Sequence, residues 1–272
     1  MKLPAKLSRK IWRAIIEFDL LQPGDRILVG LSGGKDSSFL LYALRVVRDH
    51  APFPLEVGAL TVDLGFSPDF DPAPLEDYCR RLGVPFYFRR AVLPGVEEAV
   101  KGNKAPCAAC AYFRRGIMNN FAREAGYNKV ALAHHYDDAV ETFLMSQIYS
   151  GQLKTLPPKS YLKRTGVTVI RPLIYLREKD IREGKKLTGF TPIPSPCPFD
   201  GRTKRQVVKE LIASLSAGGK HRVFANLAAA MRQGSHVDLW PPEPDRKELE
   251  RKVKAFWRGA KIEEKKDEEA LG

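Results

Sequence analysis

The sequence predicts an α/β fold in which helices cover both faces of a mostly parallel sheet. Three observations lead to this expectation: short apolar runs alternate with amphipathic segments, turns rich in Gly or Pro separate them, and no internal repeat interrupts the order. Strands that alternate with helices are joined by crossovers and so lie parallel. A chain of 272 residues is also long enough to bury a substantial core.

The elements follow from apolar periodicity and from turn residues. The first helix is expected over residues 5–20, with Leu7, Ile11 and Ile15 on its apolar face and basic residues on the other. A turn at 23–25 then leads into the first buried strand. The expected strands are 26–31, 55–62, 86–90, 129–133 and 167–171, and the expected later helices are 37–48, 74–82, 108–125, one ending near 149, and 178–187.

Two parts of the chain differ in composition. Residues 1–240 are expected to form one domain, with the basic N-terminal helix inside residues 1–22. From Trp240 onward a Pro-rich stretch leads into a charged segment with little apolar content. We therefore expect residues 241–272 to be a charged C-terminal extension, either an appended helix or a loose tail.

The chain is strongly basic. Its 45 Lys and Arg residues against 32 Asp and Glu residues give a net charge of +13. Such a surplus favours a polyanionic partner, most often nucleic acid, although a generally basic protein that uses charge for solubility is the alternative. The candidate RNA contacts are Lys6, Arg9, Lys10, Arg13, Arg114, Arg115, Lys159, Lys163, Arg202, Lys204 and Arg205.

The cysteine content and the lack of long apolar runs point to a cytoplasmic protein without a membrane partner. Four cysteines are too few and too unevenly spaced for a disulfide framework. The sequence contains neither a signal-like apolar segment nor an apolar run of membrane length. In the cytoplasm thiols stay reduced, so a Cys-x-x-Cys pair indicates metal or redox chemistry.

The segment Ser32-Gly33-Gly34-Lys35-Asp36-Ser37, hereafter the 32–37 loop, has the character of a phosphate site. It lies where a buried strand is expected to pass into a helix, so backbone N–H groups and the helix dipole face an anion. Lys35 adds a positive charge, and the two serines add hydroxyl donors. It is not a Walker A loop, which needs Gly where Val29 stands and Ser or Thr where Asp36 stands. The plainer alternative is a turn that only joins strand to helix.

The cysteines divide into a pair and two single residues. Cys107 and Cys110 at the start of a helix suit a metal site, a redox disulfide or small apolar packing. Cys197 lies far along the chain in a Pro-rich segment, and Cys79 lies mid-helix outside any motif. We therefore expect Cys79 to be a core residue.

Polar residues follow the ends of two expected strands. Asp137 and Asp138 stand where open parallel sheets bind ligands, and carboxylates suit Mg²⁺, although one of them could cap the next helix instead. Asp63 ends the second strand and is placed to meet a nucleotide sugar or a neighbouring backbone. For His134 a structural role is at least as well supported as a catalytic one.

These motifs together carry a family resemblance. The 32–37 loop resembles the PP-loop of the N-type ATP pyrophosphatases, and residues 1–240 resemble one branch of them, the tRNA 2-thiocytidine synthetase family. The other matching motifs, in order, lie at residues 18–27, 107–110, 133–138, 157–159, 171–173, 177–181 and 196–197. The ordered run is far more specific than any single motif.

The resemblance implies a fold, ligands and roles. The fold would be that of the PP-loop ATPases (adenine nucleotide alpha hydrolase-like). The implied nucleotide-binding residues are Ser32, Gly33, Gly34, Lys35, Asp36, Ser37, Asp63 and His134. The implied catalytic residues are Lys35, Asp36, Asp137 and Arg114, and Asp138 is the candidate Mg²⁺ ligand. The implied ligands of a [4Fe-4S] cluster are Cys107, Cys110 and Cys197. Asp200 stands where close relatives are expected to carry a further Cys, which puts a redox role for that position in doubt.

The expected function is ATP-dependent thiolation of tRNA. ATP would adenylate a pyrimidine C2 carbonyl, and sulfur would replace the oxygen, with cytidine 32 as the leading target. The partners are tRNA and a sulfur donor, either a cysteine desulfurase or sulfide, and a homodimer is left open. The alternatives are 2-thiouridine synthesis, whose enzymes commonly add paired Cys-x-x-Cys zinc modules that this chain lacks, lysidine synthesis, and a zinc-stabilised RNA-binding protein without catalysis.

Overall fold

The computed structural model describes residues 1–65, 70–91, 106–193, 203–217, 222–232 and 245–257. Contacts divide the chain into two units, Met1–Arg232 and Gln233–Gly272. The domain boundary predicted at residue 240 falls outside the described residues. No helix in the described part is long and apolar enough to span a membrane.

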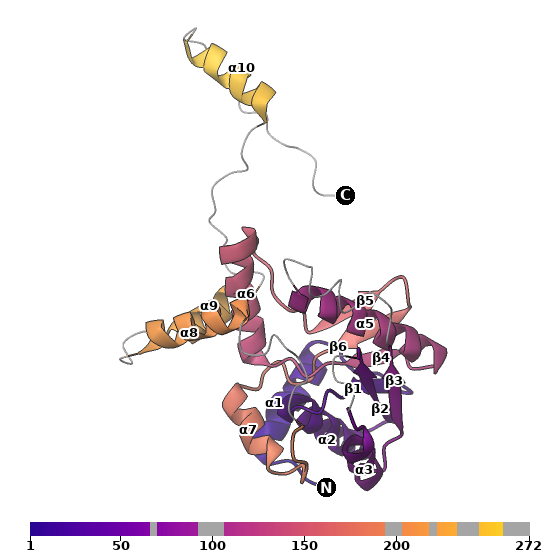
Figure 1. Ribbon diagram of the computed structural model, residues 1–272. Helices are drawn as coiled ribbons and strands as arrows, with labels where there is room; N and C mark the ends of the chain where they lie inside the picture. Colours follow the sequence, from indigo (N-terminus) through magenta and orange to yellow (C-terminus); the bar gives the residue numbers. More distant parts are fainter. Residues whose placement is uncertain (66–69, 92–105, 194–202, 218–221, 233–244, 258–272) are drawn as a thin grey trace. The chain divides into compact units, whose positions relative to one another are not determined.

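One sheet organises the first unit (Figure 1). Its strand order is β3-β2-β1-β4-β6-β5, and every neighbouring pair is parallel except β5 and β6. The strands are β1 (Arg26–Gly30), β2 (Glu56–Asp63), β3 (Phe86–Arg90), β4 (Lys129–Ala131), β5 (Lys159–Leu162) and β6 (Val167–Ile170). The mostly parallel sheet expected from the sequence is therefore confirmed, and the antiparallel edge strand β5 is an addition to it.

The helices agree with the sequence pattern up to α7. Those of the first unit are α1 (Ala5–Glu17), α2 (Lys35–His50), α3 (Ala73–Leu82), α5 (Pro106–Glu124), α6 (Tyr136–Ser150), α7 (Glu178–Lys185), α8 (Lys204–Ser216) and α9 (Val223–Ala230). Helices α8 and α9 were not expected. The second unit contains α10 (Arg246–Trp257), so part of the charged extension is helical.

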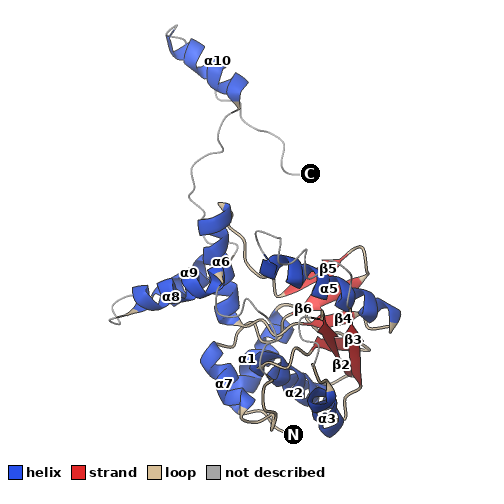
Figure 2. Ribbon diagram, in the orientation of Figure 1, coloured by secondary structure: helices blue, strands red, loops and turns tan. Residues whose placement is uncertain are grey.

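Helices cover both faces of the sheet, because alternate strand residues point to opposite sides. Ile27 and Val29 of β1 belong to a core that also contains residues of α1, α2, α3 and α7. Leu28, between them, belongs to a second core formed with Met118 and Phe121 of α5. Figure 2 shows the four helices and α5 on opposite sides of the strands. The predicted two-sided covering is confirmed.

The strand order reverses direction at β1. The chain adds β2 and β3 on one side of β1, and then β4 and the later strands on the other side. Parallel sheets bind ligands beyond the carboxyl ends of the strands at such a reversal. We call this side of the sheet its carboxyl edge; β1, β2, β4 and β6 end there at Gly30, Asp63, Ala131 and Ile170. The 32–37 loop follows β1 directly and therefore lies at the reversal.

A buried ion pair fastens the chain at the opposite edge. Lys129 Nζ lies 2.7 Å from Asp25 Oδ2 and donates to the Leu20 carbonyl at 2.6 Å. Asn128 donates to the other Asp25 oxygen at 2.8 Å. The side chains of Asp25 and Lys129 are only 4% and 6% exposed to solvent. Each buried charge is therefore stabilised by the opposite charge rather than by water.

Breaking this pair should destabilise the whole unit. Lys129→Ala leaves the Asp25 carboxylate buried without its cation, and we expect the free energy of unfolding to fall by about 3 kcal/mol in urea titrations. Arg80→Ala is the control, because the Arg80–Asp77 pair is exposed and should contribute less than about 1 kcal/mol. Equal losses in the two variants would contradict the role of burial.

Candidate active site

The 32–37 loop is shaped to receive an anion. Gly33 has a φ of +82°, a backbone conformation that residues with a Cβ rarely adopt. Gly34 caps α2 without a side-chain hydrogen bond to the first turn, so the first N–H groups of that helix remain for a ligand. The Ser37 hydroxyl holds the turn closed, because it accepts from Ser32 N at 3.1 Å and donates to the Gly34 carbonyl at 3.2 Å.

Charged groups complete the loop. Lys35 Nζ lies 3.1 Å from Asp36 Oδ2 and 3.8 Å from Glu178 Oε1. The other Asp36 oxygen, Oδ1, is buried and has no hydrogen-bond partner in the described part of the structure. An unsatisfied buried carboxylate oxygen is costly unless a ligand or a cation meets it. The loop therefore presents an ammonium group and an open hard oxygen side by side.

The segment that precedes Cys197 contacts the same loop. Ile193 N donates to the Gly33 carbonyl at 3.0 Å, and the Ile193 side chain packs against Gly33. Cys197 and Asp200 lie outside the described residues. The chain therefore enters the Cys197 segment from a residue that is hydrogen-bonded to the 32–37 loop.

Asp138 caps the helix that follows β4. Its Oδ2 accepts from His135 N at 2.9 Å, and its Oδ1 lies 3.3 Å from Arg205 Nη1 on α8. Arg205 also contacts the buried Glu141 at 3.0 Å. Capping was the alternative raised for this pair of carboxylates, and Asp138 makes that contact. Binding of Mg²⁺ by Asp138 stays a prediction.

Asp137 joins three helices. Its oxygens accept from Arg177 Nε at 3.0 and 3.1 Å, and its Oδ2 accepts from Glu178 N at 2.8 Å. The Arg177 guanidinium lies 3.3 Å from the ring centroid of Phe224 on α9. The Asp137 carboxylate thus satisfies the N-terminus of α7 and holds it to α6 and α9. A catalytic role for Asp137 stays a prediction.

Glu178 links the 32–37 loop to α8. Besides its contact with Lys35, its carboxylate lies 2.7 Å from Lys209 Nζ and 3.0 Å from Arg182 Nη2. These partners, the hydrogen bond from Lys209 above all, lower the pKa of Glu178 from 4.5 to about 2. Glu178 was noted in the sequence only as part of a motif, and its role depends on partners that no local pattern indicates.

His134 and Arg171 lie side by side at the ends of β4 and β6. Arg171 Nε donates to His134 Nδ1 at 3.3 Å, and Arg171 Nη1 donates to the Pro157 carbonyl at 2.6 Å. Burial, reinforced by the nearby Arg171 charge, lowers the pKa of His134 to about 4. Burial likewise lowers the pKa of Arg171 to about 10. His134 is therefore neutral at physiological pH.

Asp63 ends β2 as expected, and its carboxylate accepts hydrogen bonds from other groups of the protein. The side chain is buried; Oδ1 accepts from Gly65 N at 2.9 Å and Oδ2 from Arg90 Nε at 2.8 Å. These bonds fix the backbone that leaves the strand. Contact between Asp63 and a nucleotide sugar stays a prediction.

Helix α5 carries two of the predicted cluster ligands. Cys107 stands in its first turn and Cys110, which is half-buried, one turn later. Arg114 follows after one more turn, and its Nε is buried without a hydrogen-bond partner in the described residues. Positions spaced by three and four residues share one face of a helix. The third predicted ligand, Cys197, falls outside the described residues.

Cys79 is a core residue, which confirms the expectation from the sequence. It is fully buried in the core beneath α2 and α3. Burial raises the pKa of its thiol to about 12.

Several residues that were predicted to contact RNA form ion pairs or hydrogen bonds within the protein. Lys6 and Lys10 on α1 pair with the buried Asp180 of α7, and Lys159 donates to the Asp19 carbonyl at 2.6 Å. Lys163 is exposed, whereas Arg202 lies outside the described residues. The basic surplus therefore serves partly to hold α1 and α7 together.

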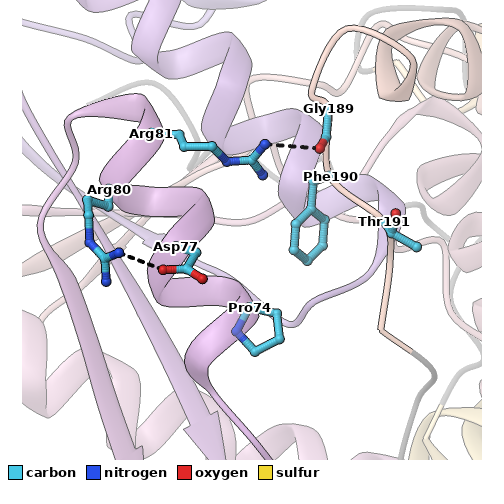
Figure 3. A pocket seen from close by; sticks show the side chains of 7 residues that line it. All are labelled: Pro74, Asp77, Arg80, Arg81, Gly189, Phe190 and Thr191. Carbon is cyan, nitrogen blue, oxygen red and sulfur yellow. Dashed lines mark hydrogen bonds and ion pairs between the residues drawn. The ribbon is translucent and has the colours of Figure 1, made fainter.

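A cavity of about 540 Å³ lies between α3 and residues 189–191 (Figure 3). Arg81 closes one side by donating to the Gly189 carbonyl at 3.3 Å, and Phe190 packs on Tyr78 with ring centroids 4.8 Å apart. None of the predicted site residues lines it. The cavity is thus separate from the carboxyl-edge residues described above.

Comparisons with known proteins agree with this geometry. Residues 5–212 match the family described as PP-loop domain. The chain is 41% identical over 218 residues to the tRNA-cytidine(32) 2-sulfurtransferase of Anaeromyxobacter dehalogenans (strain 2CP-C), covering 79% of this chain and 75% of that one. It is 39% identical over 213 residues to the enzyme of the same name from Cellvibrio japonicus (strain Ueda107), covering 78% and 70%.

A solved structure supports the fold. The U34-tRNA thiolase NcsA from Methanococcus maripaludis, solved with its [4Fe-4S] cluster, superposes with a TM-score of 0.66 at 21% identity. The match covers 83% of this chain and 76% of that one. At this identity the likeness concerns the arrangement of strands and helices.

The carboxylate of Glu178 gives a pH-dependent prediction. Because its pKa in the folded protein lies below its ordinary value of 4.5, it stabilises the fold fully above that pH and progressively less as the pH falls toward 2. We expect Glu178→Gln to lower the free energy of unfolding by about 1–2 kcal/mol at pH 7, and the difference from the parent protein to narrow below pH 4.5.

Urea unfolding at a series of pH values measures this difference. Glu183→Gln on the same helix is the matched control, because Glu183 is exposed and contacts only Lys6, at 3.8 Å, among its described ion pairs. A Glu178→Gln effect that is constant between pH 7 and pH 3 would contradict the ionic origin.

Proposed function

This chain belongs to the PP-loop family and, within it, to the tRNA-cytidine(32) 2-sulfurtransferases, and on that premise we propose that it replaces the C2 oxygen of cytidine 32 in tRNA with sulfur. It is an ATP-dependent tRNA sulfurtransferase. The observation that carries the proposal is the 32–37 loop at the strand reversal, where open N–H groups, Lys35 and an unsatisfied Asp36 oxygen converge.

The loop would hold the β and γ phosphates of ATP. The free N–H groups of the first turn of α2 donate to phosphate oxygens, and the helix dipole adds to their effect. Lys35 neutralises negative charge that develops as pyrophosphate leaves. Mg²⁺ prefers hard oxygen ligands, and we propose the Asp36 carboxylate, whose buried Oδ1 has no hydrogen-bond partner among the described residues, as one of them.

Adenylation turns a poor leaving group into a good one. The C2 oxygen of the cytosine attacks the α phosphorus of ATP, the bond to the β-phosphate oxygen breaks, and pyrophosphate departs from the 32–37 loop. A sulfur nucleophile at the oxidation level of sulfide then attacks C2, and AMP leaves with the former C2 oxygen. The contribution of the protein is to align the reactants and to balance charge at the phosphates.

The residues of α5 fit an iron–sulfur cluster. Cys107 and Cys110 share one face of the helix, and Arg114 adds on the same face a buried Nε–H that has no hydrogen-bond partner among the described residues. Cys107, Cys110 and Cys197 would hold the cluster by three thiolates. When bound, it supplies an iron with an open position for sulfide. Arg114 would donate a hydrogen bond toward that side of the site. A cysteine desulfurase or free sulfide would provide the sulfur.

Nucleoside mass spectrometry tests the activity. We expect tRNA from cells that lack the gene to contain no 2-thiocytidine, and the intact gene to restore it. Lys35→Ala should lower the rate of thiolation and of tRNA-dependent pyrophosphate release by about 10²–10³-fold, because it removes one preorganised cation from the leaving group. Lys179→Ala is the control, since Lys179 is exposed. Full activity in a folded Lys35→Ala protein would refute the phosphate site.

The cysteine variants test the cluster. Cys107→Ala, Cys110→Ala and Cys197→Ala, prepared anaerobically, should each lose bound iron and sulfide together with thiolation. Cys79→Ala should retain both, because the Cys79 side chain is enclosed in the core. Iron and zinc analysis separates the alternatives: stoichiometric zinc in an inactive protein that still binds tRNA would favour a structural zinc site.

A further inference from the structure

Arg171 is a buried cation without an acidic partner among the described residues. Only 8% of the surface of this residue is exposed to solvent. Its two described side-chain partners, His134 Nδ1 and the Pro157 carbonyl, are neutral acceptors. A buried charge without a counter-charge costs several kcal/mol, and most buried guanidinium groups are paired with a carboxylate or bind an anion.

The contact with Arg171 also fixes the tautomer of His134. A guanidinium group can only donate, so Nδ1 must be the unprotonated nitrogen that accepts from Arg171 Nε. Because His134 is neutral at physiological pH, its proton is on Nε2. No described residue accepts a hydrogen bond from that N–H. The Nε2–H group points away from Arg171, because the two ring nitrogens face different sides of the ring. No described residue accepts from the second Nη of Arg171, so this Nη remains as a donor that suits an oxyanion.

The positive surroundings strengthen this preference. Arg115 of α5 is close enough to Arg171 to lower its pKa further after burial. Arg205 of α8 is a further cation near His134, whereas Asp138 is the one carboxylate that acts on it. That carboxylate is already engaged by Arg205 and by the backbone of His135. Arg205 is balanced by Asp138 and Glu141, whereas neither Arg171 nor Arg115 has a carboxylate partner among the described ion pairs.

We propose that Arg171, oriented by its contact with His134, forms a binding site for a phosphodiester group of the tRNA backbone beside the target nucleotide. The inference rests on the proposed function, because it presumes tRNA as the substrate. The order β1-β4-β6 supports RNA rather than ATP as the source of the phosphate. Strands lie about 4.8 Å apart, so Arg171 stands about 10 Å from the 32–37 loop along the edge, beyond the phosphates that the loop holds.

Arg171→Met tests the site with purified protein. We expect its affinity for tRNA to fall by roughly 10- to 100-fold at moderate salt, because a charge-assisted phosphate contact is lost. The slope of log Kd against log salt should fall by about 0.7, the value for one phosphate of a single-stranded segment. The affinity for ATP without tRNA should be unchanged. Stability in urea should be unchanged or higher, because an uncompensated buried charge is removed.

The control removes the same charge elsewhere. Arg164→Met lies in the exposed turn that precedes β6, at the opposite edge of the sheet, and should alter tRNA affinity less than twofold. His134 provides a second pair of variants: His134→Gln keeps an oxygen that can accept from Arg171 Nε and should retain most of the affinity, whereas His134→Leu removes the acceptor and should lower the affinity. This pair decides the matter if Arg171→Met fails to fold.

The outcomes are distinct. Weaker tRNA binding with unchanged ATP binding supports the phosphodiester site. Weaker ATP binding with unchanged tRNA binding would assign the phosphate to ATP and overturn the proposal. Unchanged binding of both, or a parallel loss of stability and of both affinities, would make Arg171 a structural residue. If the parent protein does not bind tRNA, the proposed function itself fails, so the two failures are distinguishable.

Discussion

The ion pair between Asp137 and Arg177 holds the candidate site together. Through this pair the first turn of α7 is fixed against the first turn of α6, and the guanidinium group stacks on Phe224 of α9. The next residue, Glu178, then reaches both Lys35 and Lys209. Two adjacent residues, Arg177 and Glu178, thus link α6, α7, α8 and α9, and Glu178 joins this group to Lys35 of the 32–37 loop. Loss of the Asp137 carboxylate would leave an N-terminus and a guanidinium group without their acceptor.

At the carboxyl edge of the sheet, positive charges need negative charges close to them. Helix N-termini and basic side chains lie where the proposed phosphates would bind, and without a ligand their positive charges repel one another. Asp36, Asp138 and Glu178 each offset part of that charge. The charge of Arg171 is not offset in this way among the described residues, because its two described partners are neutral. In our proposal the counter-charge of Arg171 comes from a phosphate of the substrate.

The sequence predicts what depends on local pattern. The 32–37 loop, the parallel strands and the core position of Cys79 follow from glycine placement and apolar periodicity. Partners far apart in the chain do not follow from such patterns: Arg177 lies 40 residues from Asp137, and Arg205 lies 67 residues from Asp138. The positions of Asp137 and Asp138 after a strand predicted that they face a ligand. Their described contacts are instead with arginines and backbone N–H groups, which the sequence could not indicate. Helices α8 and α9, of 13 and 8 residues, were not predicted from the sequence.

The burial of Cys79 has a practical consequence for a protein proposed to handle reactive sulfur. Burial raises the pKa of Cys79 to about 12, so almost none of its thiol is ionised at pH 7, and thiolate is the form that reacts with alkylating agents, oxidants and sulfur donors. In the folded protein Cys79 is therefore unreactive toward thiol reagents. Thiol-specific labels used under native conditions will report only on Cys107, Cys110 and Cys197, and Cys79 becomes reactive when the core opens. A single reagent thus reads out both the accessibility of the motif cysteines and the integrity of the fold.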